Sequence, residues 1–591
     1  MCGIVGCILK ENENVAPILF ECISRIVYRG YDSVGLATFD DVIYVKKSRG
    51  SVEDVNKNLN LSNLPGRYGI SHLRWATVGK PETKNAHPHT DETNSVAIVH
   101  NGTLENYNEL KKELADEGHI FKSTTDSEII AQLIKKYMDE GLDLEHALRK
   151  TTQHLKGSYS IAAISKNEPD KIVATKKDSP LTLGMGDNGF YVTSDIPAIL
   201  KYAKDIITLE NEEIAVLDEN SIVVHDKNDN YIEKNICHMN WNPEFTSKPS
   251  YDHFTIKEIN EQPTIAKLTL EQINEVRDTI NEIGNIKRIC FTTGGSAYNA
   301  AMTGKYLIES LASIPTDVIN PSEFKYASKT WDENTLVIFI SYSGEEPNSV
   351  VAQRQAKKTS KTLSIANVAD STMIKEAEHS IIIKSGPEIS PAPTKSYIAQ
   401  LTAIYLIAGI LSKNNDLIKQ LSDVPTYINE ILQESDKIEE FCEKYEFDNN
   451  VLCIGRGFAY PIALEGSHKL NELARIYSVC SAGGEVKKGL MHLINKKVPL
   501  IAVVPPGKDN KKTIRNLTEF KAFEANIISI GSKNDEILSD ISDFMIGINP
   551  EVTDIIAPLV YIVPLQLLSY YLALKKGYDP DKPKLLKLIQ V

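Results

Sequence analysis

The chain has 591 residues, too many for one hydrophobic core, and this length predicts about three to five domains. Its 42% hydrophobic and 24% charged residues indicate an ordinary globular protein. The formal net charge of −14 argues against a nucleic-acid-binding protein, which normally presents a basic face. Eight scattered cysteines without a CxxC pair are typical of a reduced, cytoplasmic protein without a zinc site, and we expect no bound metal.

We expect neither a signal peptide nor a membrane span. Met1-Cys2-Gly3 leads directly into a strand-like sequence. The one long apolar stretch, 555–574, is interrupted by Pro558 and Pro564, which favours a buried helix over a transmembrane helix.

Short apolar runs separated by Gly- and Asn-containing turns fill the first third of the chain. The predicted strands are 3–9, 34–39, 96–99, 159–164 and 171–174. Helical patterns lie between them at 15–27, 106–117 and 127–138. This order predicts stacked sheets flanked by helices in a domain spanning 2–220. Polar residues accumulate near 218–229, and we expect a linker and helical segment over 221–277.

From residue 285 onward, predicted strands alternate with helices, which indicates parallel doubly wound sheets. The buried-strand candidates are 288–292, 336–340, 362–367, 380–384, 451–454 and 500–504. Long apolar helices at 397–411 and 564–574 end two similar series of elements. We interpret the repeat as a duplicated α/β unit over 278–416 and 441–581, with a C-terminal tail at 582–591. The alternative is chance similarity between two sheets of the same type.

Cys2 is a candidate amino-terminal nucleophile. Removal of Met1 would leave Cys2 with both a thiol and a free α-amino group. An α-amine titrates near ~8, so a useful fraction is neutral at pH 7 and can accept the thiol proton. The simpler interpretation is a second-position cysteine without a catalytic role.

Further candidate groups for amide chemistry follow within the next 125 residues. Arg74 can pair with a free carboxylate and Asp126 with an ammonium, so together they can hold the charged ends of an α-amino acid. Asn101 offers a side-chain N–H and Gly102 a backbone N–H to a tetrahedral oxyanion. The alternatives are a surface ion pair for Arg74 and a helix cap for Asp126.

Two turns in the second part of the chain are candidate phosphate sites. Ser341-Tyr342-Ser343-Gly344 follows a predicted strand and precedes a helix, where hydroxyls and free backbone N–H groups suit an anion. Gly294-Gly295-Ser296 follows another strand. Open α/β sheets bind ligands at the carboxyl ends of adjacent strands, so the two turns predict one crevice. Taken alone, the serine-rich turn is also compatible with a simple helix cap.

The first part of the chain resembles the class II glutamine amidotransferases. The matching motifs are Cys-Gly-Ile-x-Gly at 2–6, Tyr-Arg-Gly-Tyr-Asp-Ser at 28–33, His-x-Arg-Trp-Ala-Thr at 72–77, Asn-Ala-His-Pro at 85–88 and His-Asn-Gly at 100–102. Their combination is most similar to the hexosamine-forming branch. The resemblance implies that Cys2 attacks the glutamine amide, that Asn101 and Gly102 form the oxyanion hole, and that the glutamine-binding residues are Arg74, Trp75, Thr77 and Asp126, with Trp75 also gating an ammonia channel. Val78 replaces the family's usual His.

The second part resembles the sugar isomerase (SIS) family, which occurs twice in that branch. A Lys-Glu-Ile-x-Glu-Gln-Pro segment at 257–263 also matches. The resemblance implies an αββα N-terminal-nucleophile domain followed by two doubly wound SIS domains. It also implies that the phosphate-binding residues are Ser296, Ser341, Tyr342 and Ser343. Glu346 stands where the family has Thr, and Pro393 where it has a sugar-contacting Ser.

The isomerase residues are also assigned by resemblance. Glu472, in a match to Ala-Leu-Glu-Gly-x-x-Lys-Leu at 463–470, corresponds to the base, and Lys587 to the lysine that forms an imine with the sugar. Lys488 stands where the family has a ring-opening His, and we expect Lys488 or His492 to assist that step. The alternatives are a solvated ion pair between Glu472 and a neighbouring lysine and an ordinary basic tail around Lys587.

The implied reaction converts L-glutamine and fructose 6-phosphate to glutamate and glucosamine 6-phosphate in a cytoplasmic homodimer. It needs no cofactor, and pyridoxal phosphate in particular is not implied, because the sugar is its own redox partner. We expect neither a nucleic-acid nor a membrane partner. Two alternatives stay open: amination of a different ketose phosphate, or a glutaminase regulated by a sugar phosphate.

Overall fold

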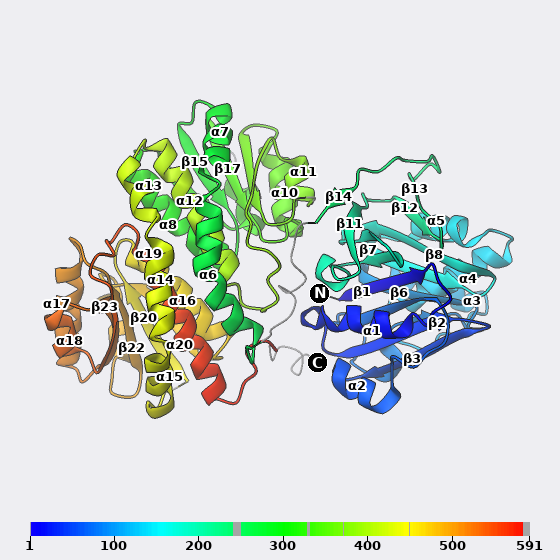
Figure 1. Ribbon diagram of the computed structural model, residues 1–591, viewed down its shortest axis with the longest axis horizontal. Helices are drawn as coiled ribbons and strands as arrows, with labels where there is room; N and C mark the ends of the chain where they lie inside the picture. The colour runs from blue at the N-terminus through cyan, green and yellow to red at the C-terminus, as the bar shows by residue number, and fades with distance from the viewer. Residues whose placement is uncertain (1, 240–249, 328–330, 370, 448, 583–591) are drawn as a thin grey trace. The chain divides into compact units, whose positions relative to one another are not determined.

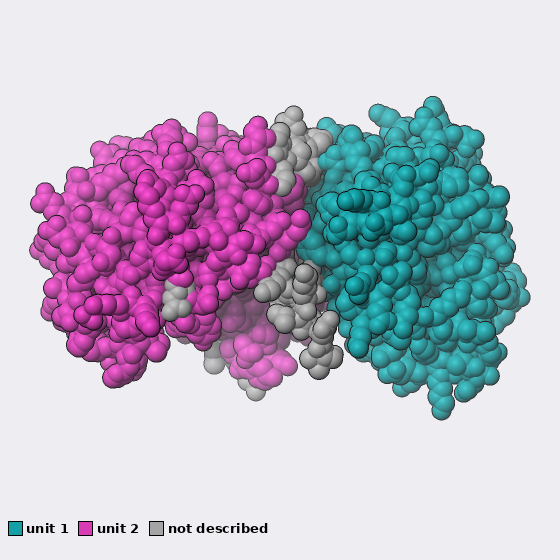
Figure 2. All heavy atoms as spheres, turned by 90° about the horizontal axis from the view of Figure 1, so that it is seen from below, with its two compact units in different colours: residues 1–247, 584–591 teal, residues 248–583 magenta. Residues whose placement is uncertain are grey.

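The structure is a computed structural model that describes residues 2–239, 250–327, 331–369, 371–447 and 449–582. Two compact units make up the chain: unit 1 comprises 1–247 with 584–591, and unit 2 comprises 248–583 (Figure 2). Each unit has its own sheets and its own hydrophobic core.

Unit 1 contains two stacked sheets (Figure 1). The strands of the larger sheet, in spatial order, are β14 (Cys237–His238), β11 (Ala203–Thr208), β9 (Thr182–Gly186), β10 (Gly189–Thr193), β1 (Gly3–Leu9), β4 (Tyr68–Arg74), β2 (Ser33–Phe39) and β3 (Ile43–Arg49). Those of the smaller sheet are β13 (Ile222–His225), β12 (Ile214–Leu217), β8 (Glu168–Lys177), β7 (Gly157–Ser165), β6 (Val96–Leu104) and β5 (His89–Thr90). The strand pairings of the described residues in this unit are antiparallel.

Helices cover the outer face of each sheet. They are α1 (Ala16–Ser24) and α2 (Val52–Leu59) on the larger sheet, and α3 (Tyr107–Asp116), α4 (Glu128–Asp139) and α5 (Leu144–His154) on the smaller one. β1 is apolar throughout because both of its faces are buried. Ile4 and Ile8 face the second sheet, whereas Val5 and Cys7 pack under α1. The predicted αββα sandwich is confirmed.

The sheets of unit 1 continue beyond residue 220, where we expected a linker to begin. β13 pairs with β12, and β14 pairs with β11. Both strands are short and lie among Asp and Asn residues typical of turns, so their sequences carry little strand signal. The expected segment 221–277 therefore contains strands of unit 1 and helices of unit 2.

Unit 2 contains two five-stranded sheets in which every pairing is parallel. The first has the order β16 (Thr316–Ile319), β15 (Arg288–Thr292), β17 (Thr335–Ile340), β18 (Lys361–Ala366) and β19 (His379–Ile382). The second has the order β21 (Tyr477–Ala482), β20 (Asn450–Gly455), β22 (Pro499–Val504), β23 (Asn526–Ser532) and β24 (Phe544–Ile548). The same order, with the first strand second in space, supports the predicted duplication.

Long helices join the two sheets into one core. The helices of unit 2 are α6 (Phe254–Leu270), α7 (Ile273–Ile283), α8 (Ser296–Leu311), α9 (Phe324–Ala327), α10 (Pro347–Ala356), α11 (Thr372–Glu376), α12 (Lys395–Leu411), α13 (Asn415–Leu421), α14 (Val424–Gln433), α15 (Ser435–Lys444), α16 (Ala459–Glu472), α17 (Asn510–Lys521), α18 (Glu536–Ile541), α19 (Ala557–Val560) and α20 (Ile562–Lys575). A single hydrophobic cluster includes α8, α12, α16 and α20 and both sheets.

The apolar segment near the C-terminus is a core helix, as predicted. Among the described residues, the stretch Ala557–Lys575 has the length and hydropathy of a membrane-spanning helix. However, 89% of that stretch is buried inside the protein. Because α20 packs against α15 and α16, its apolar side chains already have protein partners.

Asp581 ties the two ends of unit 2 together. Its carboxylate accepts hydrogen bonds from the backbone N–H groups of Phe254 and Thr255, at 2.7 and 2.9 Å, and from the Thr255 hydroxyl at 2.8 Å. The first N–H groups of a helix have no partner within the helix, and Asp581 supplies one for α6. The start of the C-terminal tail is thereby fixed at the first turn of α6.

Candidate active sites

The predicted glutaminase site of unit 1 is built around Cys2, immediately before β1. The Cys2 Sγ atom accepts a hydrogen bond from the Trp75 N–H at 3.2 Å, and the thiol lies 3.4 Å from the Trp75 carbonyl oxygen. The Cys2 carbonyl accepts from Arg29 Nε and from Asn101 Nδ2, both at 3.1 Å. Since β1 lies between β4 and β10, the nucleophile is held at the end of a central strand.

Asn101 is oriented by a buried histidine. His72 Nε2 lies 3.0 Å from the His100 carbonyl oxygen and 3.1 Å from Asn101 Oδ1. A carbonyl oxygen only accepts, so His72 carries its proton on Nε2 and donates to both oxygens. This bond directs the amide NH₂ of Asn101 toward the backbone carbonyl oxygen of Cys2, beside the predicted nucleophile. Sequence reasoning missed His72, although it stands two residues before Arg74 in a matching motif.

Gly102 occupies a position that accepts no side chain. Its φ is +131°, and a Cβ atom there would lie 2.0 Å from the Ser158 carbonyl oxygen. The glycine therefore lets the backbone that follows Asn101 approach β7 closely. Of the two predicted oxyanion donors, Asn101 contacts the Cys2 carbonyl oxygen, and Gly102 is the next residue of β6.

The predicted glutamine-binding residues have different surroundings. The buried Arg74 guanidinium donates to the carbonyl oxygens of Val78 and Gly79, at 2.6 and 2.9 Å, and of Lys80 at 3.3 Å. Val78 thus holds Arg74 through its backbone, which any residue would supply. Asp126 is buried and accepts from the Leu104 N–H at 2.9 Å, whereas Thr77 is exposed.

Burial favours the neutral forms of the Cys2 thiol and of three histidines of unit 1. It raises the pKa of the Cys2 thiol, although Arg74 and Arg29 act to lower it. It lowers the pKa of His72 to about 3, and those of His87 and His89 fall well below the usual value. A neutral thiol needs a base to become a nucleophile, which is the role expected of its own α-amino group.

The predicted sugar-phosphate crevice of unit 2 lies at the carboxyl ends of β15 and β17. These strands are adjacent and parallel, and Thr293 Oγ1 donates to the Ile340 carbonyl at 2.7 Å, which joins the turns that follow them. Ser296 begins α8, and its buried hydroxyl has no hydrogen-bond partner among the described residues. The structure therefore brings Ser296 and the 341–344 turn to one edge of the sheet, as predicted.

The serine hydroxyls of the second turn close the loop on itself. Ser341 Oγ accepts from the Gly344 N–H at 3.0 Å, and Ser343 Oγ accepts from the Glu345 N–H at 3.2 Å. Tyr342 reaches away, because its hydroxyl accepts from the Glu388 N–H at 2.7 Å. Tyr342 thus contributes to the loop's position.

Glu346 does not face the crevice as an unpaired charge. Its carboxylate accepts from the Ser349 N–H at 2.7 Å and caps the first turn of α10. Pro393 lies within a segment held by Glu388, whose carboxylate accepts from the N–H groups of Thr394 and Ser396. Glu346, which replaces the family's Thr, therefore has a local structural role.

Glu472 belongs to a buried charge network on α16. Its carboxylate lies 2.5 Å from Lys469 Nζ and 3.2 Å from His468 Nε2. Lys469 is fully buried and also lies 3.4 Å from Glu465, which accepts from Asn299 of α8 at 2.8 Å. Burial acts to raise the pKa of Glu472, but Lys469 and His468 prevail and hold it at about 2. Glu472 is therefore ionised at neutral pH.

The other predicted isomerase residues lie outside this network. Lys488 is exposed and pairs with Glu485 at 2.7 Å. His492 is also exposed and lies in a separate 3-10 turn after Gly489, so the two candidates for ring opening do not share a helix. Lys587 lies outside the described residues.

The Lys-Glu-Ile-x-Glu-Gln-Pro segment positions the chain that follows β19. Glu258 of α6 accepts from the N–H of Ile389 at 2.5 Å, and Glu261 pairs with the buried Lys395 at 2.6 Å. The motif match identified this segment without showing its partners, because they are about 130 residues away in the sequence.

Comparisons with known proteins agree with this arrangement. Residues 72–201 match the glutamine amidotransferase domain family, and 282–409 and 447–576 each match the SIS domain family. The glutamine–fructose-6-phosphate aminotransferase (isomerizing) of Methanothermobacter thermautotrophicus is 47% identical over 584 residues, 99% of this chain and 98% of that protein. The enzyme of that name from Clostridium perfringens is 37% identical over 99% of this chain and 98% of its own. The solved C-terminal domain of glucosamine-fructose-6-phosphate aminotransferase from Francisella tularensis superposes with a TM-score of 0.54 at 30% identity, and covers 57% of this chain and 99% of that one.

The fold and the two sites define a class II glutamine amidotransferase joined to a pair of SIS domains. Since the similarity to full-length relatives extends from end to end, the match is not confined to single domains. The chain belongs to the isomerising glutamine–fructose-6-phosphate aminotransferase family.

Proposed function

We propose that the chain transfers the amide nitrogen of L-glutamine to fructose 6-phosphate and yields glucosamine 6-phosphate and L-glutamate, the first step of hexosamine formation. The observation that supports this best is the length of the match. A relative named for this activity aligns with 99% of the chain, across the Cys2 site and both parallel sheets. The capping role of Glu346 also removes one reason to prefer a different acceptor.

In the first half-reaction, Cys2 acts once Met1 has been removed. Its α-amine takes the thiol proton, and the thiolate attacks the amide carbon of glutamine. The tetrahedral oxyanion receives hydrogen bonds from Asn101 and Gly102. Arg74 and Thr77 hold the glutamine carboxylate and Asp126 its ammonium, beside Trp75. The C–N bond breaks, ammonia leaves, and water hydrolyses the thioester to glutamate.

In the second half-reaction, the sugar phosphate binds at Ser296, Ser341 and Ser343, in the turn that Tyr342 positions. Lys587 forms an imine with the C2 carbonyl and releases water, and ammonia then replaces the lysine. Glu472 removes a proton from C1 and returns it to C2, and the proton of the C1 hydroxyl passes to the imine nitrogen, which leaves an aldehyde at C1 and an amine at C2. Because Lys469 holds Glu472 ionised, this ion pair must loosen as the sugar binds. Lys488 or His492 assists ring opening.

The test is an assay of purified protein with glutamine and fructose 6-phosphate. We expect equal amounts of glutamate and glucosamine 6-phosphate, measured by mass spectrometry. Borohydride added with fructose 6-phosphate alone should label Lys587, because only an imine is reduced to a stable amine. Glutamate without amino sugar would contradict the proposal, and product from another ketose phosphate would change the acceptor.

We also propose that the protein is a cytoplasmic homodimer. We further propose that its SIS domains span residues 278–416 and 441–581. Large exposed apolar side chains near the second parallel sheet support self-association, namely Tyr477, Leu493 and Phe523. Sedimentation of the full chain tests this, and a monomer at micromolar concentration would contradict it.

A further inference from the structure

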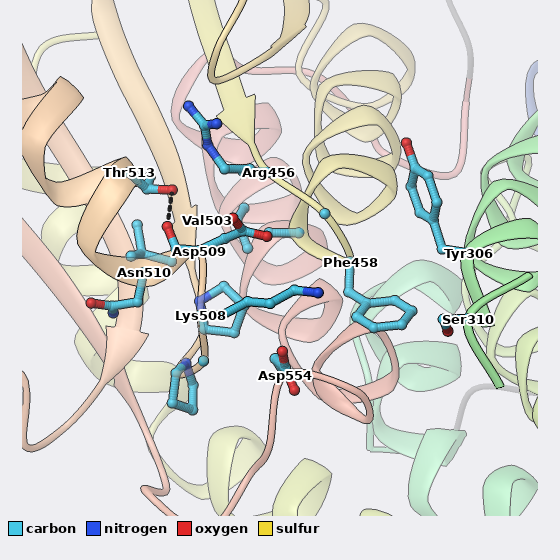
Figure 3. A pocket seen from close by; sticks show the side chains of 16 residues that line it. Tyr306, Ser310, Arg456, Phe458, Val503, Lys508, Asp509, Asn510, Thr513 and Asp554 are labelled. Carbon is cyan, nitrogen blue, oxygen red and sulfur yellow. Dashed lines mark hydrogen bonds between the residues drawn. The ribbon is translucent and has the colours of Figure 1, made fainter.

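A cavity of about 380 Å³ opens at the carboxyl ends of β20 and β22, in the second SIS domain (Figure 3). Its lining comes from the turns that follow these strands, from the first turn of α17, and from α8 of the first SIS domain. The proposed reaction does not use this cavity.

The cavity is the counterpart of the predicted sugar-phosphate crevice in the duplicated unit. In both SIS domains the turn after the first strand contains a glycine with positive φ, Gly295 at +60° and Gly457 at +58°. The residue after this glycine is Ser296 in the first domain and Phe458 in the second. In the turn after the third strand, Pro505 stands where Ser341 stands. The crevice has therefore been kept while its hydroxyls have been replaced.

The correspondence between the two SIS domains extends to α8, the helix of the first domain that lines the cavity of the second. When the glycines are aligned, Tyr306 and Ser310 of α8 correspond to His468 and Glu472 of α16. Tyr306 and Ser310 both line the cavity. The position of the proposed base is thus occupied by a serine, which cannot act as a carboxylate base at neutral pH. The cavity is equipped for binding and not for proton transfer.

The charged groups of the cavity suit a phosphorylated ligand. Lys508 extends across it toward Phe458, and Arg456 lies at one end (Figure 3). Arg456 Nε is buried and has no hydrogen-bond partner among the described residues. A buried donor without a partner is costly, and a phosphate oxygen would supply one.

Backbone groups add to this preference. The first turns of α16 and α17 both line the cavity, and neither has a side-chain cap at its N-terminus. Two carboxylates are present as well. Asp509 pairs with Lys512 at 3.2 Å, whereas Asp554 lines the cavity near Lys508 and can accept from sugar hydroxyls (Figure 3).

We propose that this cavity is a second, non-catalytic binding site for a phosphorylated sugar, with Arg456 and Lys508 holding the phosphate and Asp554 the hydroxyls. The inference rests on the proposed function only for the comparison with the first crevice. It assigns the second SIS domain a binding role separate from turnover.

Calorimetric titration with glucitol 6-phosphate tests the proposal, because this open-chain probe has no carbonyl and cannot react. We expect two molecules to bind per unaltered chain. The double variant Arg456→Ala/Lys508→Ala should bind one, with affinity for the other lowered at least about tenfold. Lys511→Ala, which removes an exposed lysine of α17 outside the cavity, three residues after Lys508, should still bind two.

A second variant separates this inference from the proposed function. Ser341→Ala/Ser343→Ala should lose the first site and keep the second. If the proposed function fails, the unaltered chain will bind one molecule that depends on Arg456 and Lys508. One molecule that depends only on Ser341 and Ser343 would overturn the second site. Hydrogen exchange on unaltered protein gives an independent result: the probe should protect 456–459 and 505–513, and unchanged exchange there would also overturn it.

Discussion

The Cys2 site of unit 1 and the Glu472 site of unit 2 are both partly buried, but burial acts on their charges in opposite ways. Around Cys2, burial favours the neutral forms of the thiol and of His72. Around Glu472, the buried Lys469 lies against two carboxylates and holds Glu472 ionised. In the proposed mechanism, the first site has to create its nucleophile during the reaction, whereas the second holds an ionised carboxylate that must be released from its partner.

This difference shows that a buried reactive group needs either neutrality or a partner. His72 reaches only carbonyl oxygens, so a proton added to its Nδ1 would remain unpaired. The buried ammonium of Lys469 would likewise destabilise the folded protein if the carboxylate of Glu472 were removed. The two sites should therefore respond differently to mutation and to pH.

The largest expected effect is at the nucleophile. Cys2→Ala should lower glutamine hydrolysis by at least about a thousandfold, because no other group supplies the attacking sulfur. Sugar turnover driven by added ammonia should persist. Glutamate release measures the first activity, and Cys237→Ala, in β14 of the same unit, is the matched control. Intact-mass analysis showing Met1 retained in active enzyme would contradict the mechanism.

The next effect concerns the charged site. Glu472→Gln should lower sugar turnover by about a hundred- to ten-thousandfold, the usual contribution of a positioned base, and leave glutamine hydrolysis unchanged. Glu443→Gln, an exposed change on α15, controls for the loss of a charge. Since Lys469 loses one of its two carboxylate partners, thermal unfolding must be measured in parallel. A folded Glu472→Gln enzyme with normal sugar turnover would disprove the assignment.

The two units should differ in mild acid. The pKa of folded His72 is about 3, below the unfolded value near ~6.5, so its contribution to stability is complete above that pH and declines as the pH falls toward 3. At pH 5 the loss is about 2 kcal/mol for this residue. The contribution of Glu472, with a folded pKa of about 2, is kept down to about pH 4.3.

Hydrogen exchange between pH 7 and pH 5, corrected for intrinsic rates, measures this difference. Peptides from β4 should lose protection before peptides from α16. Loss of protection in α16 first would mean that the histidines do not control the acid stability of unit 1.

The smallest expected effect is at Glu346. Glu346→Thr should change sugar-phosphate affinity by less than about twofold, because Glu346 caps α10 and threonine can also cap a helix. Binding of glucitol 6-phosphate checks this, with Glu376→Thr as a surface control. A large loss of affinity would show that Glu346 contacts the acceptor.

Periodicity was sufficient for much of the fold. The predicted strand 288–292 coincides with β15, because a run of buried residues ended by Thr293-Gly294 leaves little choice of boundary. β13 and β14 were missed because they contain four and two residues, and their pairing depends on partners already in place.

The residues of the two sites also differ in how readily the sequence reveals their roles. The sequence predicts roles for Cys2, Asn101 and Gly102 because such chemistry requires particular residue types in a fixed order. It did not reveal that His72 orients Asn101 or that Glu346 caps a helix. Both are contacts of side chains that also suit many other roles.

The bond between Asp581 and the first turn of α6 also bears on how unit 2 can be rebuilt. Because Phe254 N lies 2.7 Å from Asp581 Oδ2, the two ends of this unit meet in space. A short glycine-serine linker can therefore join them, and new ends can open at the exposed Lys413 between α12 and α13. Such a circular permutant would reverse the order of the two parallel sheets along the chain and keep every strand neighbour. It would also separate the order of synthesis from the architecture, so that either SIS domain could be made first.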